Sequence, residues 1–319
     1  MWDVIVVGGG PAGLSAALML GRACRKVLVL DSGEYRNGAS HAAHGFLTRD
    51  GTPPEEIRRL AREELARYDV EVRQARAVDA RRCETTFEVI LDDGSRKVCR
   101  RLLLATGVVD ELPRVPGIEP LYGRSVHHCP YCDGWEVRGQ PLAAYGRGHE
   151  AAELALALTS WSDDVIFFTD GPSRLGEEDR LLLARHRIQV RGERVARLEG
   201  QDGLLAAVVL RNGERVLRRA LFFHGPTRPR ADLAERLGCL FNRKGAVKTG
   251  RLEGTNVPGL WVVGDASHDV KWVIVAAAEG AKAAMAINKS LRGETTASLV
   301  GYSRALEAVA PAALEAPLG

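Results

Sequence analysis

The sequence predicts an α/β protein with two Rossmann-like, three-layer (ββα) dinucleotide-binding domains, the first of them discontinuous. Residues 3–31 and 141–170 each predict a strand, a glycine-rich turn, a helix and a second strand. A later segment, residues 255–265, returns to the pattern of the first domain, so the second domain is expected to be an insertion. The 319 residues suffice for two domains of roughly 100–200 residues each.

Composition excludes several classes of protein. With 45% hydrophobic and 27% charged residues, the chain has the composition of a globular protein rather than a disordered or fibrous one. Forty-four Lys and Arg against 41 Asp and Glu give a formal net charge of +3, which argues against a nucleic-acid partner. No apolar run approaches the roughly 18 residues of a membrane span. The N-terminus begins with a strand-like run and no basic signal region, so a cytoplasmic location is expected.

The first predicted unit contains a dinucleotide turn. An apolar strand over residues 3–7 leads into a G-x-G-x-x-G sequence, a helix over 14–22 and a second strand over 26–30. The three glycines allow a tight turn, close backbone approach to a pyrophosphate and close helix–strand packing, and an acid at the end of the second strand can bind a ribose. The alternative is a glycine turn in an empty α/β domain. The predicted site residues are Gly8, Gly10, Pro11, Ala12, Gly13, Asp31 and Ser32.

Between the two units, residues 54–68 predict an amphipathic helix and residues 70–104 predict strands. The last of these strands ends in the small-residue turn Ala105-Thr106-Gly107. Pro113, Pro116 and Gly117 follow and predict a crossing between domains.

The second predicted unit repeats the design with different residues. A strand over 141–145 leads into a G-x-G-x-x-A turn at Gly146, Gly148 and Ala151, followed by a helix and a strand that ends at Asp170. These four residues form a candidate nicotinamide site.

The third segment completes the first domain. A strand leads into Gly264-Asp265, and residues 273–291 predict a long Ala-rich helix. We therefore expect the first domain to span 1–116 and 245–319 and the second to span 117–244. Residues 303–309 predict a short terminal helix, with a mobile Ala- and Pro-rich tail after it.

Six cysteines are too few and too scattered for a disulfide framework, but two of them form the sequence Cys129-Pro130-Tyr131-Cys132-Asp133-Gly134. A redox-active pair is the favoured interpretation. A zinc site using the preceding His127 and His128 is the alternative, although a second ligand pair at the usual spacing is missing. No metal is therefore expected.

Taken in order, the glycine turn, Ala105-Thr106-Gly107, the C-x-x-C and Gly264-Asp265 resemble the low-molecular-weight thioredoxin reductase family of flavoproteins over residues 2–292. The resemblance implies FAD in the first domain, with Asp31 at the adenosine ribose and Asp265 at the ribityl–phosphate region. It also implies a homodimer. The further FAD contacts expected are His44, Ala105, Thr106, Gly107, Gly264, Lys271, Trp272 and Val273.

The same resemblance assigns roles at the redox pair. Cys132 is expected to face the flavin, Cys129 to exchange with an external dithiol, and Asp133 to manage the thiol proton. His128 is a further candidate base, with His44 as its alternative.

The chain departs from the family in ways that concern its electron donor. Where NADPH-using members carry arginines, the chain has Phe168-Thr169-Asp170-Gly171, and Asp170 would repel a 2′-phosphate. Lys271-Trp272 replaces the family's Arg-Gln near the flavin. These features resemble the branch of FAD-dependent dithiol oxidases, which use oxygen, whereas the retained Asp133 resembles the reductases.

We therefore expect an FAD-dependent dithiol/disulfide oxidoreductase, either an oxidase of a small-molecule dithiol that uses O2 or a thioredoxin reductase that uses NAD(P)H or another reduced donor. Its partner would accordingly be a small-molecule dithiol or a thioredoxin-like protein. A flavin-bound regulatory module without turnover is the remaining alternative.

Overall fold

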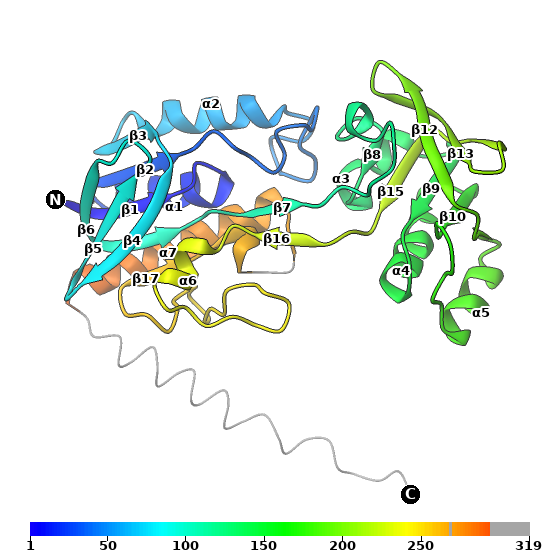
Figure 1. Cartoon of the computed structure of the whole chain (residues 1–319). Helices are drawn as coiled ribbons and strands as arrows, with labels where there is room; N and C mark the ends of the chain where they lie inside the picture. The colour runs from blue at the N-terminus through cyan, green and yellow to red at the C-terminus, as the bar shows by residue number, and fades with distance from the viewer. Residues whose placement is uncertain (268–269, 294–319) are drawn as a thin grey trace, which may run out of the picture. The chain divides into compact units, whose positions relative to one another are not determined.

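The structure is a computed structural model that describes residues 1–267 and 270–293. The chain forms two compact units, shown in Figure 1. The first comprises Met1–Tyr35, Arg58–Val108 and the chain from Pro229, and the second comprises Arg36–Ile57 and Val109–Arg228. Residues 36–57 thus belong with the second unit. The predicted helix over 303–309 and the tail after it lie outside the described residues, and the predicted domain limits stay a prediction.

A seven-stranded sheet forms the centre of the first unit. Its strands lie in the order β3-β2-β1-β6-β5-β4, and β17 also pairs with β6. Five of them are parallel: β1 (Trp2–Val7), β2 (Val27–Asp31), β3 (Val70–Gln74), β6 (Arg96–Leu104) and β17 (Leu260–Val262). The antiparallel strands β4 (Ala77–Cys83) and β5 (Thr86–Leu91) complete the sheet. The carboxyl ends of β1, β2, β6 and β17 therefore lie at one edge, where an α/β sheet binds its ligand.

Both faces of this sheet are buried. Along β1, Val4 and Val6 belong to one apolar cluster and Ile5 and Val7 to the other, as the two-residue repeat of a strand requires. The helices of the unit are α1 (Pro11–Arg22), α2 (Pro54–Leu65, which begins in the second unit), α6 (Asp232–Arg236) and α7 (Val273–Leu291). Helix α2 ends at Leu65, three residues before the end predicted at Tyr68. The Tyr68 N–H donates to the Leu65 carbonyl at 3.0 Å, in a tight turn that leads to β3.

The second unit has the predicted three layers. A parallel sheet of order β11-β10-β9-β15-β8 packs on one face against the antiparallel β12-β13-β14 sheet and on the other against helices α4 and α5. The strands are β8 (Val126–His127), β9 (Leu142–Tyr145), β10 (Val165–Phe168), β11 (Gln189–Arg191), β12 (Val195–Gln201), β13 (Leu204–Leu210), β14 (Arg215–Leu217) and β15 (Ala220–Phe223). The helices are α3 (Pro130–Asp133), α4 (His149–Leu158) and α5 (Glu177–Arg185), with 3-10 turns η1 (Glu119–Leu121) and η2 (Trp135–Val137). The predicted α/β class with two Rossmann-like sheets is confirmed.

The two chain segments that pass between the units pair with each other. Strand β7 (Val108–Asp110) and strand β16 (Thr227–Pro229) form a separate two-stranded sheet. Among residues 1–267 and 270–293, no helix is long and apolar enough to cross a membrane.

Helices α1 and α7 approach so closely that a side chain at their contact is excluded. A Cβ at Gly280 of α7 would lie 2.0 Å from the carbonyl oxygen of Ala12 in α1. Gly280→Ala should therefore lower the free energy of unfolding by about 1–3 kcal/mol, because backbone rather than a flexible side chain must move. Urea unfolding followed by circular dichroism measures this, with Met285→Ala on the exposed face of α7 as the control. An unchanged midpoint for Gly280→Ala would contradict the packing described.

Candidate active site

The turn between β1 and α1 has the geometry of a dinucleotide cradle. Gly8 has φ +118°, and a Cβ there would lie 2.2 Å from the Ala105 carbonyl oxygen. A Cβ at Gly13 would lie 2.0 Å from the Gly8 carbonyl oxygen, so helix and strand touch through backbone. Gly10, the N-cap of α1, has no atom within 4 Å of its Cβ position. The predicted uses of the three glycines are thus consistent with the structure, and open space faces the helix N-terminus.

Asp31 ends β2 and lies directly behind this turn. Its side chain is buried, and a Cβ at Gly9 would lie 2.2 Å from its Oδ2. The carboxylate accepts hydrogen bonds from Tyr35 Oη at 2.5 Å, Arg62 Nη2 at 2.6 Å and the Gly33 amide at 3.0 Å. Burial and the bond to Asp31 raise the pKa of Tyr35, so the phenol stays protonated and donating.

Tyr35 and Arg62 were not predicted. Tyr35 stands four residues after Asp31, and Arg62 comes from α2, where it resembles any charged residue of an amphipathic helix. The guanidinium of Arg58 stacks over the Tyr35 ring at 3.7 Å and holds the tyrosine from its other side. These residues fix the position of the Asp31 carboxylate, the predicted ribose ligand.

The other first-unit motifs meet the same turn. Ala105 contributes the carbonyl beside Gly8, and Thr106 Oγ1 donates to the Arg230 carbonyl at 2.6 Å. Gly264, in the 3-10 turn η3 (Gly264–Ala266) after β17, would place a Cβ 3.2 Å from that of Ala12. Its amide donates to buried Glu279 of α7 at 2.7 Å, a partner that the sequence did not reveal. Asp265 directly follows Gly264 in η3, while Lys271 and Trp272 precede Val273, the first residue of α7.

The cysteine pair lies in the second unit, and its first member follows β8 with only His128 between them. Cys129 is the N-cap of α3 and Cys132 lies in its four-residue length. Both are free thiols of intermediate exposure, and they hydrogen-bond each other. This bond, then burial and the charges of Cys129 and Asp133, raise the pKa of Cys132. The two thiols are therefore close enough for exchange, and the Cys132 thiol stays protonated near pH 7.

His128 lies in a separate polar cluster. Its Nδ1 is 3.9 Å from Asp110 Oδ2 and has no hydrogen-bond partner among the described residues. Burial, with a smaller contribution from Arg36, lowers the pKa of His128 to about 4. Asp110 itself accepts two hydrogen bonds from Arg36, each 2.8 Å, and one from Tyr122 at 3.2 Å. His128 is therefore neutral near pH 7, which is the form that a base requires.

His44 lies in the unit that carries the cysteines. Its Nε2 is 3.6 Å from Glu136 Oε1, and its Nδ1 is 3.5 Å from Asp50 Oδ1. Glu136 lies four residues after Cys132 in the chain, so His44 links residues 36–57 to the segment that follows the redox pair.

The second glycine turn has an arginine across it. Gly148, the N-cap of α4, has open space at its Cβ position, as Gly10 does. Asp170, after β10, accepts a hydrogen bond from the Val195 amide at 2.8 Å and lies 3.4 Å from both Arg147 and Arg194. Arg147, between the two glycines of the turn, also donates to the Thr169 carbonyl at 2.9 Å. The Asp170 carboxylate of the candidate nicotinamide site is thus already engaged.

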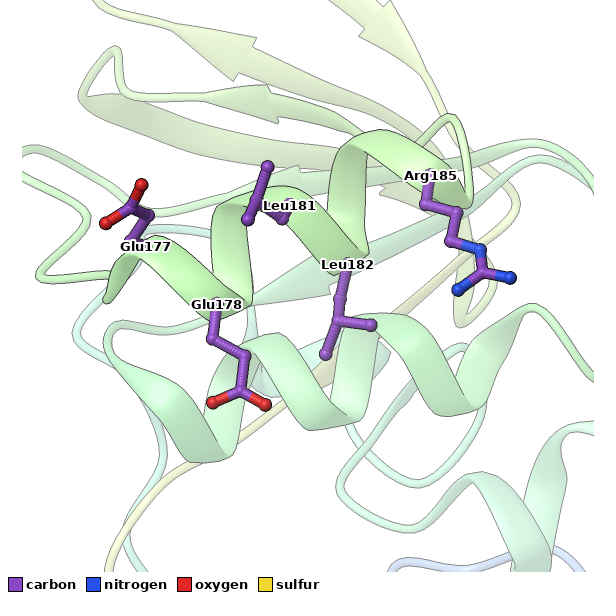
Figure 2. A pocket seen from close by; sticks show the side chains of 5 residues that line it. All are labelled: Glu177, Glu178, Leu181, Leu182 and Arg185. Atoms are coloured by element: carbon purple, nitrogen blue, oxygen red, sulfur yellow. The ribbon is translucent and has the colours of Figure 1, made fainter.

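Figure 2 shows a hollow along α5 whose lining side chains, Glu177, Glu178, Leu181, Leu182 and Arg185, all come from that one helix. Within residues 1–267 and 270–293, no three His, Cys, Asp or Glu side chains are placed to share a metal ion.

Comparisons with known proteins agree with this geometry. A family model described as pyridine nucleotide-disulphide oxidoreductase matches residues 2–280. A probable thioredoxin reductase of Arthroderma benhamiae is 33% identical over 303 residues, 84% of this chain and 74% of that protein. The crystal structure of HlmI superposes with TM-score 0.89 and 37% identity, covering 96% of this chain and 97% of that one. A putative thioredoxin reductase TrxB of Bacillus anthracis gives 0.86 and 32%, covering 92% and 99%.

The chain belongs to the pyridine nucleotide-disulphide oxidoreductase family. Within this family it is a flavin-dependent oxidoreductase of the thioredoxin reductase type, with a C-x-x-C at Cys129 and Cys132. The resemblance stated from the motifs is confirmed at this level.

His128 should make this oxidoreductase sensitive to acid. A histidine whose pKa is lower in the folded than in the unfolded state binds fewer protons when folded, so stability falls as pH drops from about 6.5 towards 4. Because the His128 side chain is 33% exposed, solvent screens part of this effect, and we expect the free energy of unfolding to fall by about 1–2 kcal/mol. His128→Phe should lose less stability than wild type between pH 7 and pH 4.5 in urea unfolding of the apoprotein. Exposed His186→Phe is the control, and an equal loss in wild type and His128→Phe would refute the assignment.

Proposed function

We propose that this chain is an FAD-dependent dithiol/disulfide oxidoreductase in which Cys129 and Cys132 exchange electrons with FAD and with a thioredoxin-like protein. The hydrogen-bonded thiol pair at the start of α3, followed directly by Asp133, is the observation that carries the proposal. The thioredoxin reductases among its relatives support the choice of partner.

FAD fits the first unit on the geometry of its glycine turn. The open space before Gly10 leaves room for a pyrophosphate on the amides of α1, and Asp31 is the ribose ligand. Asp265 is the proposed partner of the ribityl–phosphate region. Bound there, the flavin supplies two-electron transfer, and the protein supplies position and charge.

The cysteines carry the electrons between partners. When the disulfide is reduced it takes up two electrons and two protons, and the dithiol returns both when it is oxidised. We assign Cys129 to exchange with the external partner and Cys132 to exchange with the flavin. Asp133, next to Cys132, accepts and returns the thiol proton.

A specific observation favours a second candidate, an oxidase of a small-molecule dithiol that passes electrons through FAD to O2. Asp170, held by the Val195 amide and lying beside Arg147 and Arg194, stands where NADPH-using members of the family carry arginines for the 2′-phosphate. For NADPH, the carboxylate would also repel the 2′-phosphate. An enzyme that oxidises its dithiol with O2 needs no nicotinamide site.

Gly10→Val tests the FAD site. Since nothing lies within 4 Å of the Gly10 Cβ position, the valine should be accommodated by the apoprotein while it fills the space proposed for the pyrophosphate. We expect loss of the yellow flavin from the purified variant with a thermal midpoint close to that of wild-type apoprotein. Wild-type flavin content in Gly10→Val would exclude this turn as the FAD site.

Anaerobic reduction of the holoenzyme tests the direction of electron flow. NADH, NADPH, a reduced thioredoxin and a small aliphatic dithiol are added separately while flavin absorbance is followed. Bleaching by NADH or NADPH supports the reductase. Bleaching by the dithiol alone, reversed by air, supports the oxidase. Cys132→Ser should abolish bleaching by any thiol donor, and bleaching that persists in this variant would refute the role of the cysteine pair.

A further inference from the structure

The two adjacent histidines before the redox pair are directed to different carboxylates. His127 Nδ1 lies 3.3 Å from Asp133 Oδ1, whereas His128 Nδ1 lies 3.9 Å from Asp110 Oδ2. The pairing gives the carboxylate assigned to the thiol proton a histidine partner that the motif did not identify.

His127 is held rigidly by the sheet. It ends β8, pairs in register with Phe222 of the neighbouring strand β15, and is 6% exposed. Its ring lies 5.4 Å from the Phe222 ring, with an interplanar angle of 31°. The imidazole therefore has little freedom to leave the position in which it faces Asp133.

Asp133 is less constrained by its own segment. It is the last residue of a four-residue helix, its side chain is 24% exposed, and its amide donates to the Cys129 carbonyl at 3.3 Å. Its negative charge acts on the Cys132 thiol. The carboxylate thus lies 3.3 Å from His127 Nδ1 and, from the position next to Cys132 in the chain, acts on the thiol through its charge.

We propose that His127 is a positioning residue, which holds Asp133 through Oδ1 and leaves the second carboxylate oxygen to accept the proton of the thiol. This deepens the proposed function and rests on it. When a thiol becomes a thiolate its proton moves to Asp133, and in the reverse step the proton returns to sulfur. His127 contacts neither sulfur in this scheme and acts only through the carboxylate.

The groups that share this electrostatic environment are few. The negative charge of Asp133 favours the protonated forms of Cys132, His128 and Tyr122, and the positive charge of Arg36 disfavours them. His127 also disfavours the protonated form of His128. Arg36 is bonded to Asp110, so Asp110 offsets its charge. A change in thiol reactivity on losing His127 must therefore be separated from effects of this second cluster, which a double-mutant cycle does.

Alkylation of the reduced holoenzyme by iodoacetamide is the test, because it needs neither a substrate nor electron transfer. Rates at Cys129 and Cys132 are measured by peptide mass spectrometry from pH 5 to 10 in wild type, His127→Phe, His127→Gln, Asp133→Asn and His127→Phe/Asp133→Asn. His149→Phe, which removes a histidine of α4 from its pair with Asp179 of α5, is the matched control.

In His127→Phe, the ring packing on Phe222 is kept but the donor to Asp133 is lost. The carboxylate charge is then less compensated, so the Cys132 alkylation profile should move up by about one pH unit, roughly a tenfold slower reaction at fixed pH. His127→Gln keeps a donor and should stay near wild type. In the Asp133→Asn background, His127→Phe should cause no further shift. His149→Phe should match wild type.

A shift of equal size in the Asp133→Asn background would overturn the proposal, since His127 would then act independently of the carboxylate. An unshifted His127→Phe profile would overturn it too. If His127→Phe proves unfolded by circular dichroism, His127→Leu provides the same comparison. Failure of the proposed function is distinguishable from failure of this proposal. If none of the added donors bleaches the flavin of the wild-type enzyme, the alkylation profiles can still follow the expected pattern.

Discussion

The geometry of the first unit depends on backbone contacts that admit no side chain. Gly8 touches the backbone of Ala105, Gly13 touches the backbone of Gly8, and Gly280 of α7 touches Ala12. Together these contacts fix the first turn of α1 against the ends of β1 and β6 and against the long helix. The N-terminal amides of α1 therefore point into the open space before Gly10 because packing directs them there. An anion bound at these amides meets donors already in place, which lowers the entropic cost of binding.

The parts of the molecule that follow from local sequence were predictable. The strand–turn–helix–strand pattern and the glycine spacing predict Gly8, Gly13 and Asp31 in the roles that their geometry permits, since each role is set within about 30 residues. Partners far apart in sequence were not predictable. Arg36 reaches Asp110 across 74 residues, and a charged loop residue gives no sign of such a pairing. The grouping of residues 36–57 with the cysteine-bearing unit has the same cause, because contacts such as His44 to Glu136 are tertiary.

Asp31 and Asp170 occupy equivalent places in the two βαβ units, yet their surroundings differ. Asp31 is the last residue of β2, whereas Asp170 lies two residues after β10, and each accepts a backbone amide and lies beside arginine. Arg62 comes from α2, away from the turn residues. Arg147, in contrast, lies between Gly146 and Gly148, so it crosses the mouth of its own turn. The same βαβ design therefore holds both acids by an amide and an arginine, but only the second unit takes its arginine from within the glycine turn itself.

The thiol pair shows how reactivity can be restrained in a resting enzyme. A hydrogen bond to Cys129, burial and the negative charge of Asp133 all raise the pKa of Cys132. Together they outweigh the opposing charge of Arg36, so the thiol stays protonated rather than ionised to a thiolate. Thiols are oxidised and alkylated through the thiolate, and a protonated, half-buried thiol is a poor target for unintended disulfides or peroxides. The consequence is that the proton must leave as the electrons do. In the proposed scheme, the Asp133 carboxylate next to Cys132, paired with His127 of β8, is the acceptor for that proton.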